Sequence, residues 1–567
     1  MGIPSPLVLL VFPCLSFPRL LPSPIPHQTR KAMSTSNAFA SSSTTPGPKP
    51  VHPLQIPEIL LGVGAFLPIR DLRSCLRVCV AFHDTLAPLI WSAPRLKDDQ
   101  GCLIPKETVQ AHAHLVQYLL LACEADGRYL KAYAALNFPN LKRLVIAGIP
   151  SVGNAPWRSA MDGPLPLFIQ RHKETLQALE LTNFESTADT SKLWTSLSKV
   201  PGLSQLVIED STIHGNQSLK AFWDFVAQDS LRGLHLHKVV IRGKVPSSIL
   251  ASKSFKLQDA ALVGLDIGDD MLVALMVYLC LSPDLRSLTW ETVYQTRDSV
   301  LEKVHSIRSL TEILRGSSHR FAGLRMWRLY GPGSPDFILA NFLNALSHGL
   351  ADVQLRRTDF GPLAFRALMD HHALTLTNLD LTQCKDSKCA MIQQALCVCP
   401  GLISIKGRGL LAMDVMKTKE CPWVCQRLEQ WALSIHMDTK DPYDKAAHEE
   451  IFGRLSLLTR LTRLDLLGDF EGPGGGASLL ERCPHPTISM QLSLGLGEIR
   501  TLRCLEYLMC NGDDERVSIK DISFFYSAFP VAKHIFCSLN SRVMLHPDLP
   551  KIANLRKQSH GGSAFAT

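Results

Sequence analysis

Three pairs of cysteines have the residue types that could hold a metal ion. A zinc site needs thiolate and imidazole ligands at short, regular spacing, with C-x-x-C pairs as its usual mark in a sequence. None of the pairs has that two-residue spacing, and two of them fall where a repeat would bury a free thiol. We therefore predict no metal site and no cofactor. The candidates are Cys384/Cys389, Cys397/Cys399 and Cys421/Cys425, with His371 and His372 earlier in the chain.

Catalytic motifs were sought next, because an enzyme needs an acid, a base or a nucleophile brought to one place. The glycine-rich run Gly472–Gly476 has no following Lys-Ser/Thr and no strand-to-helix frame, so it is not a phosphate-binding loop. The sequence contains no H-E-x-x-H and no G-x-S-x-G. We expect no catalytic residues and a protein that is not an enzyme.

Polar residues that alternate with leucines are the remaining candidates for a site. His235 and His237 stand two residues apart, as strand neighbours on one face do, and favour solvent-facing recognition over metal binding. Similar positions recur along the chain, and their mixed chemistry predicts no charge class for a partner. The alternative is that each is an ordinary solvated residue. The candidate substrate-binding residues are His235, Thr289, Arg328, Gln354, Arg356, Asp380 and Asp465.

The elements that carry these residues repeat along the chain. The unit is an apolar residue, two others, an apolar residue, one other, and a third apolar residue. Degenerate copies at Leu257 and Leu402 fill two gaps, and Leu505-Leu508 is a looser copy. The clearest copies are Leu141-Leu144-Ile146, Leu176-Leu179-Leu181, Leu203-Leu206-Ile208, Leu231-Leu234-Leu236, Leu285-Leu288-Trp290, Leu324-Trp327-Leu329, Leu350-Val353-Leu355, Leu376-Leu379-Leu381, Leu428-Trp431-Leu433 and Leu461-Leu464-Leu466.

The spacing of these copies identifies the architecture. Copies that start at 176, 203, 231, 257 and 285 lie 27, 28, 26 and 28 residues apart, and those at 324, 350, 376, 402 and 428 lie 26 apart. Periods of about 20–29 residues with this strand pattern are typical of leucine-rich repeats. We expect Leu379 and Leu381 to point inward, Asn378 and Asp380 to face solvent, and helices such as 364–370 and 389–398 to cover the other side.

The predicted fold class is therefore α/β. A short N-terminal helical unit precedes an irregular leucine-rich-repeat solenoid, a curved parallel sheet with outer helices. The expected segments are a disordered leader at 1–52, short helices at 53–95, a helical connector at 96–140 that includes 108–125, the solenoid at 141–545 and a disordered tail at 546–567. Met33 offers a second start, so 1–32 is either an extension that is not part of the native protein or a disordered leader; a signal peptide over 1–21 is the less favoured alternative.

Composition narrows the partners. The 567 residues are 46% hydrophobic and 19% charged, which is typical of a folded protein. The net charge of +8 is dispersed rather than gathered into a basic stripe, so we expect no nucleic acid partner. The apolar stretch near the N-terminus is broken by prolines, so we expect no membrane partner. Sixteen scattered cysteines favour a reducing compartment, cytoplasmic or nuclear.

The segment 53–95 resembles the F-box, a short helical motif. Its pattern also departs from that family at the start, where Gln55-Ile56 replaces the usual Leu-Pro. With the repeats behind it, the chain is similar to fungal F-box proteins that carry leucine-rich-repeat-like arrays. Later elements, Pro422-Trp423-Val424-Cys425 and 502–508, are similar to that group as well. The matching residues are Pro57-Glu58-Ile59-Leu60, Phe66-Leu67, Asp71-Leu72, Leu76, Val78-Cys79, Phe82, Leu89 and Trp91.

This resemblance implies a function. An F-box docks onto a Skp-type adaptor, which connects it to the cullin scaffold of an SCF ubiquitin ligase, while the repeats bind the protein substrate. The alternative is a repeat scaffold with no role in ubiquitin transfer. For Leu76, Val78 and Phe82, a place in the helices' own core competes with a place at the interface. The implied adaptor-binding residues are Ile56, Pro57, Ile59, Leu60, Leu67, Leu72, Leu76, Val78, Phe82 and Trp91.

Overall fold

The computed structural model describes sixteen stretches of the chain, separated by gaps. By its internal contacts the chain divides into Met1–Ile59 and Leu60–Thr567. The expected leader 1–52, the Gly472–Gly476 loop and the expected tail 546–567 lie outside the described residues. These are 53–94, 96, 104–123, 132–148, 163–184, 190–243, 256–267, 275, 279, 282–291, 323–331, 335–346, 349–384, 386–467, 486–512 and 517–539.

Short helices form the first described segment, as the sequence predicts. A 3-10 turn, η1 (Pro53–Gln55), precedes α1 (Pro57–Phe66), α2 (Ile69–Cys75) and α3 (Val80–Trp91). Pro68 is the N-cap of α2 and the helix ends at Cys75. Asp71 lies in its first turn, where a carboxylate interacts favourably with the positive end of the helix dipole.

The helical module, defined here as residues 60–94, has a small core of its own. Leu60, Leu72 and Leu86 are buried together, and the partly buried residues around them are Leu67, Cys75, Leu76, Phe82, Leu89 and Ile90. Gly64 allows α1 to approach α3. A Cβ atom at this position would lie 2.6 Å from Leu86 Cδ2 and 2.7 Å from Leu89 Cδ1, closer than packed atoms come.

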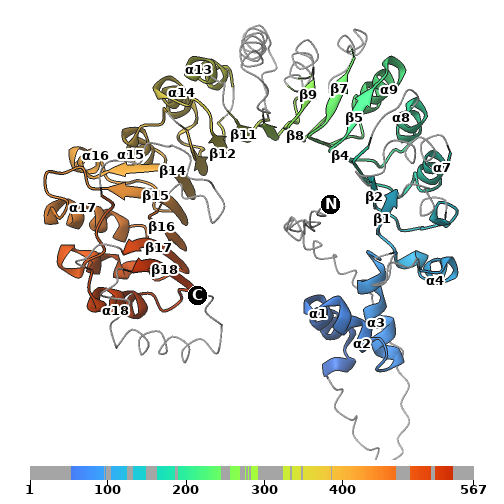
Figure 1. Cartoon of the computed structure of the whole chain (residues 1–567), viewed down its shortest axis with the longest axis horizontal. Coiled ribbons are helices and arrows are strands. Elements are labelled where there is room, and N and C mark those ends of the chain that lie inside the picture. Colours follow the sequence, from blue (N-terminus) through green and yellow to red (C-terminus); the bar gives the residue numbers. More distant parts are fainter. Residues whose placement is uncertain are drawn as a thin grey trace, which may run out of the picture. The chain divides into compact units, whose positions relative to one another are not determined.

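One parallel sheet runs through the rest of the chain (Figure 1). Each strand pairs with its neighbours in sheet order, which is the topology of stacked repeats. The predicted α/β solenoid of leucine-rich repeats is confirmed. Its strands are β1 (Tyr118–Cys123), β2 (Arg143–Gly148), β3 (Ala178–Thr182), β4 (Gln205–Glu209), β6 (Gly233–His237), β8 (Asp259–Val263), β10 (Ser287–Glu291), β11 (Met326–Tyr330), β12 (Asp352–Arg356), β13 (Asn378–Asp380), β14 (Ser404–Leu411), β15 (Gln430–His436), β16 (Arg463–Asp465), β17 (Tyr507–Gly512) and β18 (His534–Leu539).

The sheet begins earlier than the repeat count predicted. Within the expected helical connector the described elements are α4 (Lys106–Ala111), the 3-10 turn η2 (Ala113–Leu115) and strand β1. Leu119 and Leu121 are buried while Leu120 between them is exposed, an alternation of period two that only a strand produces. Strand β1 pairs with β2 along its whole length, which satisfies its backbone groups. The prediction of a helix over 108–125 is therefore confirmed only at its start, in α4, and is wrong over strand β1.

Two further features were not predicted. Strand β18 closes the sheet at its other end. Three short strands form a second parallel sheet, β5 (Thr212–His214), β7 (Val240–Arg242) and β9 (Asp266–Ile267).

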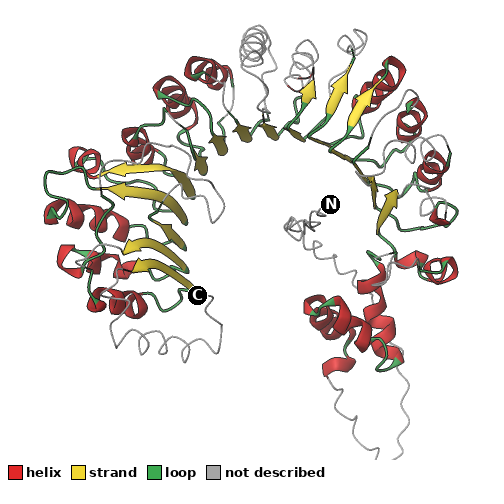
Figure 2. Ribbon diagram, viewed as in Figure 1, coloured by secondary structure: helices red, strands yellow, loops and turns green. Residues whose placement is uncertain are grey.

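Helices cover one side of the long sheet (Figure 2). The helices predicted over 364–370 and 389–398 are confirmed as parts of α14 and α15. The helical elements of the solenoid are α7 (Pro164–Arg171), α8 (Ser191–Leu197), α9 (Asn216–Val226), α13 (Asp336–Ala345), α14 (Pro362–His372), α15 (Cys389–Val398), α16 (Ala412–Lys417), α17 (Lys445–Ser456), η4 (Leu492–Leu494), η5 (Leu496–Thr501) and α18 (Ile519–Ala528).

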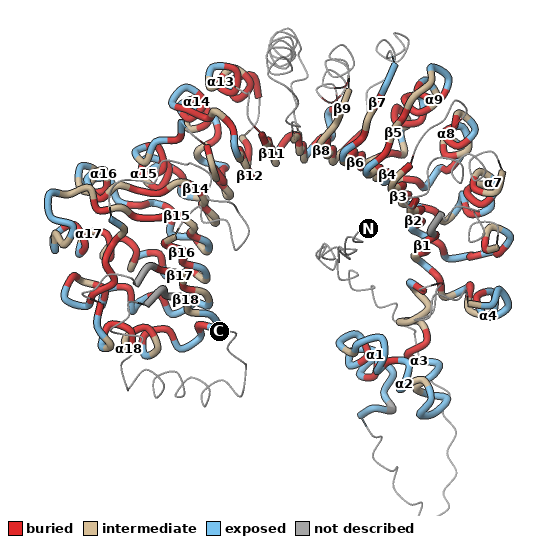
Figure 3. The backbone as a smooth tube through the Cα atoms, in the orientation of Figure 1, coloured by how far each residue is buried: buried red, intermediate tan, exposed pale blue. Residues whose placement is uncertain are grey.

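The core lies between the strands and these helices (Figure 3). Inward strand residues such as Leu234, Leu288 and Leu355 have no exposed surface, and Trp194 of α8 and Trp431 of β15 are fully buried as well. Burying one leucine side chain contributes roughly 1.5–3 kcal/mol relative to exposure. Since each unit's inner face is covered by its neighbours, stability comes from stacking and the opposite face of the sheet is left open.

Polar contacts join successive repeats behind the sheet. The Asp336 carboxylate of α13 accepts hydrogen bonds from the backbone N–H groups of Gly361, Leu363 and Ala364 at 2.9 Å each, and so caps α14 from the neighbouring repeat. His172 works similarly, because its Nε2 accepts from the Phe138 N–H at 3.0 Å. These contacts fix the register between repeats and hence the spacing of residues on the open face.

Candidate protein-binding surfaces

The open face of the long sheet brings the predicted substrate-binding residues together. Strand register places His235, Ala261, Thr289, Arg328, Gln354, Asp380 and Lys406 in one row, and the row continues through Ala432 to Asp465. Six of the seven predicted residues therefore share one line across the sheet. Arg356 belongs to the next row of the same face, beside Tyr330.

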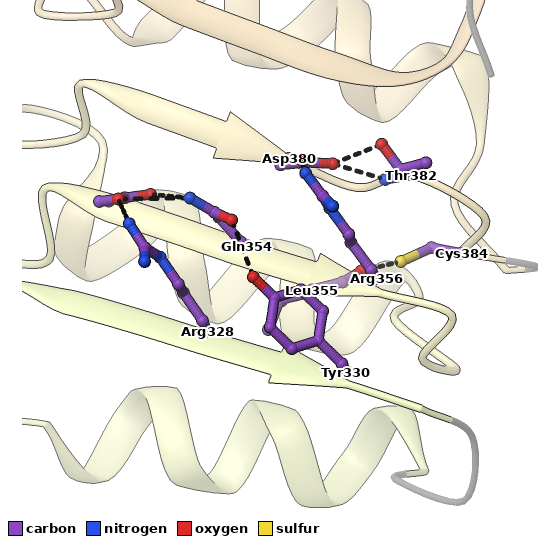
Figure 4. A network of polar contacts seen from close by, with 9 residues as sticks. Arg328, Tyr330, Gln354, Leu355, Arg356, Asp380, Thr382 and Cys384 are labelled. Atoms are coloured by element: carbon purple, nitrogen blue, oxygen red, sulfur yellow. Dashed lines mark hydrogen bonds and ion pairs between the residues drawn. The ribbon is translucent and has the colours of Figure 1, made fainter. Parts of the chain in front are cut away.

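The centre of this face is a connected polar network (Figure 4). Arg356 donates from Nε and Nη2 to Asp380 Oδ2 at 2.9 and 2.7 Å, and its guanidinium lies 5.7 Å from the centre of the Tyr330 ring. The Tyr330 hydroxyl donates to Gln354 Oε1 at 3.1 Å. Burial, the first cause, raises the pKa of Tyr330, so this hydroxyl stays a donor at neutral pH.

A second arginine extends the network by one strand. Arg328 Nη2 lies 3.2 Å from Asp352 Oδ2, and Gln354 donates to the same carboxylate. In both pairs the acid is covered and the cation is exposed. The side chains of Asp352 and Asp380 are 9% and 7% exposed, whereas those of Arg328 and Arg356 are 33% and 43% exposed. The exposed part of both ion pairs is therefore mainly the guanidinium group.

Two of the predicted residues do not face solvent as expected. Asp380 and Asp465 are buried, with 5% and 6% of their surface exposed. Arg356 covers Asp380, which also accepts from the Thr382 backbone N–H at 3.1 Å. Asp465 accepts from the Leu467 N–H at 3.1 Å and lies 3.5 Å from Arg463. These bonds offset the cost of burying the carboxylates, so both residues position the surface rather than form it.

Histidines and acids occupy an earlier part of the open face. His235 Nε2 lies 2.7 Å from Asp259 Oδ2. Burial opposes the charge of Asp259, but hydrogen bonds from His235 and Ser287 outweigh it and lower the pKa of this carboxyl group. Burial and the neighbouring His235 lower the pKa of His237, while burial, Glu180 and Asp210 raise the pKa of Glu209. His235 therefore pairs with Asp259, and the His237 ring stacks on that of His235 with 6.5 Å between the ring centres.

The helical module exposes an unusual amount of apolar surface for its size. Phe66 is 88% exposed, Val80 76% and Val78 66%, and Leu61, Val63 and Ile69 are each between 37% and 43% exposed. We name these six residues the apolar patch. In the preceding unit, Ile56 and Ile59 are exposed as well, at 37% and 41%. Exposed apolar side chains at this density mark an interaction surface rather than ordinary scatter.

Several predicted adaptor-binding residues lie elsewhere. Leu60 and Leu72 are buried in the module's own core, and Leu67, Leu76 and Phe82 pack against them. Trp91 stacks on His112 at 4.2 Å and packs against the core of the solenoid. Leu60 and Leu72 are therefore core residues rather than surface, while Leu67, Leu76, Phe82 and Trp91 are partly buried and combine packing with some exposure. Among the ten, those classed as exposed are Ile56, Pro57, Ile59 and Val78.

The other patch residues were missed by the sequence reasoning, although α1 carried a signal for them. Its sequence, PEILLGVGAF, is apolar on every side. A helix of that kind must be covered all round. The module covers only one side of it.

Three of the six candidate metal-binding cysteines are core residues. Cys384, Cys399 and Cys425 are buried, and burial raises the pKa of Cys399 and of Cys425 to about 12. Cys389 and Cys397 are partly buried, and Cys421 is exposed. Within the described residues, no group of three or more His, Cys, Asp or Glu side chains is placed to hold a metal ion.

Comparisons with known proteins add little beyond the fold. No family model matches the sequence, and no curated protein matches it. Among similar solved structures is a chain from the crystal structure of the TLR13–ssRNA13 complex. It is 12% identical, the match covers 75% of this chain and 72% of that chain, and the TM-score is 0.30.

The class of fold therefore rests on this chain's own strand register, which is that of a leucine-rich-repeat solenoid. Within the described residues, no helix has the length and apolar character needed to cross a bilayer.

Proposed function

We propose that this chain is the substrate-recognition subunit of an SCF-type ubiquitin ligase. The helical segment 53–95 docks onto a Skp-type adaptor, which connects it to the cullin scaffold, and the solenoid binds a target protein. The chain itself acts by binding, without catalytic residues or a cofactor, in the cytoplasm or nucleus. The resemblance of the segment 53–95 to the F-box suggested this division, and the surfaces described above support it.

The apolar patch is the observation that carries the proposal. Val78 and Val80 lie at and just after the α2–α3 turn, and Phe66 ends α1. The module satisfies its own core without them, since Leu60, Leu72 and Leu86 already bury one another. Leaving Phe66 in water has a cost of roughly 1.5–3 kcal/mol relative to burying it. A partner that covers the patch recovers this energy.

Co-purification of a Skp-type adaptor with the full chain tests the proposal. Val78→Asp and Val80→Asp place a charge in the patch and should abolish capture, while the fold remains, because neither side chain contributes to the core. Leu374→Asp is the matched control, since Leu374 is 80% exposed but follows α14 on the solenoid. It should capture the adaptor as the unmodified chain does.

Leu60→Asp and Leu72→Asp are poor tests, because both residues are buried and a charge there unfolds the module. The proposal is wrong if the unmodified chain captures no adaptor. It is also wrong if the Val78→Asp variant still captures the adaptor.

The second candidate is an interaction scaffold without a role in ubiquitin transfer, which the altered start at Gln55 and Ile56 favours. Deleting residues 53–95 distinguishes the two. Accumulation of the bound partner in cells supports the ligase subunit, and an unchanged partner level supports the scaffold.

A further inference from the structure

A tyrosine–arginine–carboxylate unit occurs three times on the open face of the long sheet. In each, a tyrosine and an arginine are register partners on neighbouring strands: Tyr118 with Arg143, Tyr330 with Arg356, and Tyr507 with Arg463. The guanidinium lies over the tyrosine ring, at 5.5, 5.7 and 4.4 Å from its centre. We name these the first, second and third triads.

Each triad also contains a carboxylate that forms an ion pair with the arginine. Glu180 lies 2.6 Å from Arg143, Asp380 2.7 Å from Arg356 and Asp465 3.5 Å from Arg463. The arginine side chains are 46%, 43% and 46% exposed, whereas their acids are 19%, 7% and 9% exposed. Since the acid is less exposed than the arginine in every case, the triad presents its cation outward.

Another arginine shows that this arrangement is not what core packing produces. Arg454 also lies over an aromatic ring, that of Trp423, and pairs with Glu450 at 2.7 Å. Here the order is reversed, because the arginine side chain is 6% exposed and its acid 20%. Its remaining N–H groups donate to the Cys421 and Thr418 carbonyl oxygens. Arg454 is a packing residue, whereas the triad arginines are held at the surface.

We infer that the three triads are anchor points for acidic side chains of one protein partner, which lies across the open face. The guanidinium groups of the triads belong to side chains that are 43–46% exposed, and the planar fork of N–H donors matches the geometry of an incoming carboxylate. Stacking on tyrosine holds that fork in place before binding, which lowers the entropy lost on binding. The second triad is strengthened by its neighbours Arg328 and Lys406, which share the face.

The positions of the triads define the spacing of the partner's acidic groups. Arg356 on β12 and Arg463 on β16 are four strands apart in the sheet, about 19 Å at roughly 4.8 Å per strand. Through the register of the strands between them, Asp352 on β12 lies in the same row as Arg463 on β16. Arg356 stands four residues after Asp352, so it lies about 13 Å further along the strand direction than Arg463 does. The direct distance between the backbone positions of Arg356 and Arg463 is therefore about 23 Å, which an extended peptide spans in roughly seven residues.

This spacing gives a direct test with synthetic peptides and the full chain. The probe carries two Glu-Glu pairs seven residues apart in a Gly/Ser/Thr background. One comparison peptide has the pairs three residues apart, one has a single pair, and one has Gln in place of Glu. Engagement of both triads should make the seven-residue probe bind about tenfold or more tighter than the single pair. The three-residue peptide should bind as the single pair does.

Conservative variants identify the anchors. A lysine at position 356 or 463 (Arg356→Lys or Arg463→Lys) keeps the positive charge but loses the planar fork and the stacking on tyrosine. Each variant should therefore bind the seven-residue probe only as tightly as the unmodified chain binds the single-pair peptide. Arg366→Lys is the matched control, because Arg366 is exposed on α14, and it should change nothing. Tyr330→Phe keeps the ring and should bind normally, while Tyr330→Leu should bind as Arg356→Lys does. Thermal unfolding of each variant shows that the solenoid is intact.

Three results overturn the inference: equal affinity for the two spacings, full affinity in both lysine variants, or a single-stranded RNA oligonucleotide that binds tighter than every peptide through the same arginines. The inference rests on the proposed function only in taking the open face as the partner-binding surface. Adaptor capture is therefore measured on the same preparation. Intact capture without spacing-dependent peptide binding removes the triads as anchors and leaves the proposed ligase role in place.

Discussion

The helical module and the solenoid differ in how completely they bury their large apolar side chains. The module buries three leucines completely and leaves Phe66, Val78 and Val80 in contact with water. In the solenoid, each strand places its leucines at the interface with the next repeat, and its open face carries arginine, tyrosine and buried acids. The difference teaches that the module leaves apolar side chains uncovered, whereas the charged side chains at the centre of the solenoid's open face pair with one another and leave mainly guanidinium groups exposed.

The largest effect should come from removing a phenylalanine ring from the solenoid, compared with removing one from the helical module. Phe222→Ala in α9 removes a ring with no exposed surface, and should lower the free energy of unfolding by about 3–5 kcal/mol. Phe66→Ala in α1 removes an exposed ring, and should change the stability by no more than about 0.5 kcal/mol. Urea denaturation measures both. A large loss for Phe66→Ala would show that the ring is packed, and the contrast between the regions would fail.

The glycines of α1 should give a smaller effect, confined to the module. Gly64→Val forces atoms into Leu86 and Leu89, and should destabilise the module by about 1–3 kcal/mol. Gly62→Val is the matched control, since no atom lies within 4 Å of a Cβ there. Hydrogen exchange of the α1 and α3 amides reads out the module alone. If both variants exchange alike, α1 does not pack on α3 through Gly64.

Acid should produce the smallest effect, and in the solenoid rather than in the module. Burial, the main cause, and the positive charge of Arg171 lower the pKa of His172 below its usual 6.5, although the hydrogen bond to the Phe168 carbonyl opposes this shift. Nε2 of the ring accepts from the Phe138 N–H. The unfolded chain then binds the extra proton, so stability falls as the pH drops below 6.5 and is unaffected above it. For one proton the slope is at most about 1.4 kcal/mol per pH unit.

His172→Gln removes this titration, so its unfolding free energy should fall less between pH 7 and pH 5 than that of the unmodified chain. His114→Gln, which changes an exposed histidine outside this contact, is the comparison variant. Equal slopes for the two variants would contradict the assignment to His172.

The fold of the solenoid was largely predictable. The apolar triplets located strands β2 to β17 of the long sheet, even where Ala260 and Ile405 replaced leucine, because inward positions must be apolar wherever repeats stack. Strand β1 was missed since its run of leucines has helical content as well as alternation, and only pairing with β2 decides between the two. The second short sheet was missed because its strands are two or three residues long.

The candidate surfaces were predictable in part. Alternation showed which strand residues leave the core, so Arg328, Gln354 and Arg356 were found on the open face. Alternation did not show that Asp380 is covered, because its burial depends on Arg356 of the neighbouring strand. In the module the sequence resemblance named Leu60 and Val78 together, although one is core and the other surface.

The sequence by itself determined the repeat period, the inward residues and the helical segment before them, because these follow from local spacing and the burial of apolar side chains. The tertiary structure alone decided which acids lie beneath which arginines, how far apart the triads stand, and which apolar residues of the module stay exposed. The physical reason is that these properties belong to pairs of strands or helices. Strand register and helix packing fix them, and neither is written in the spacing of one segment.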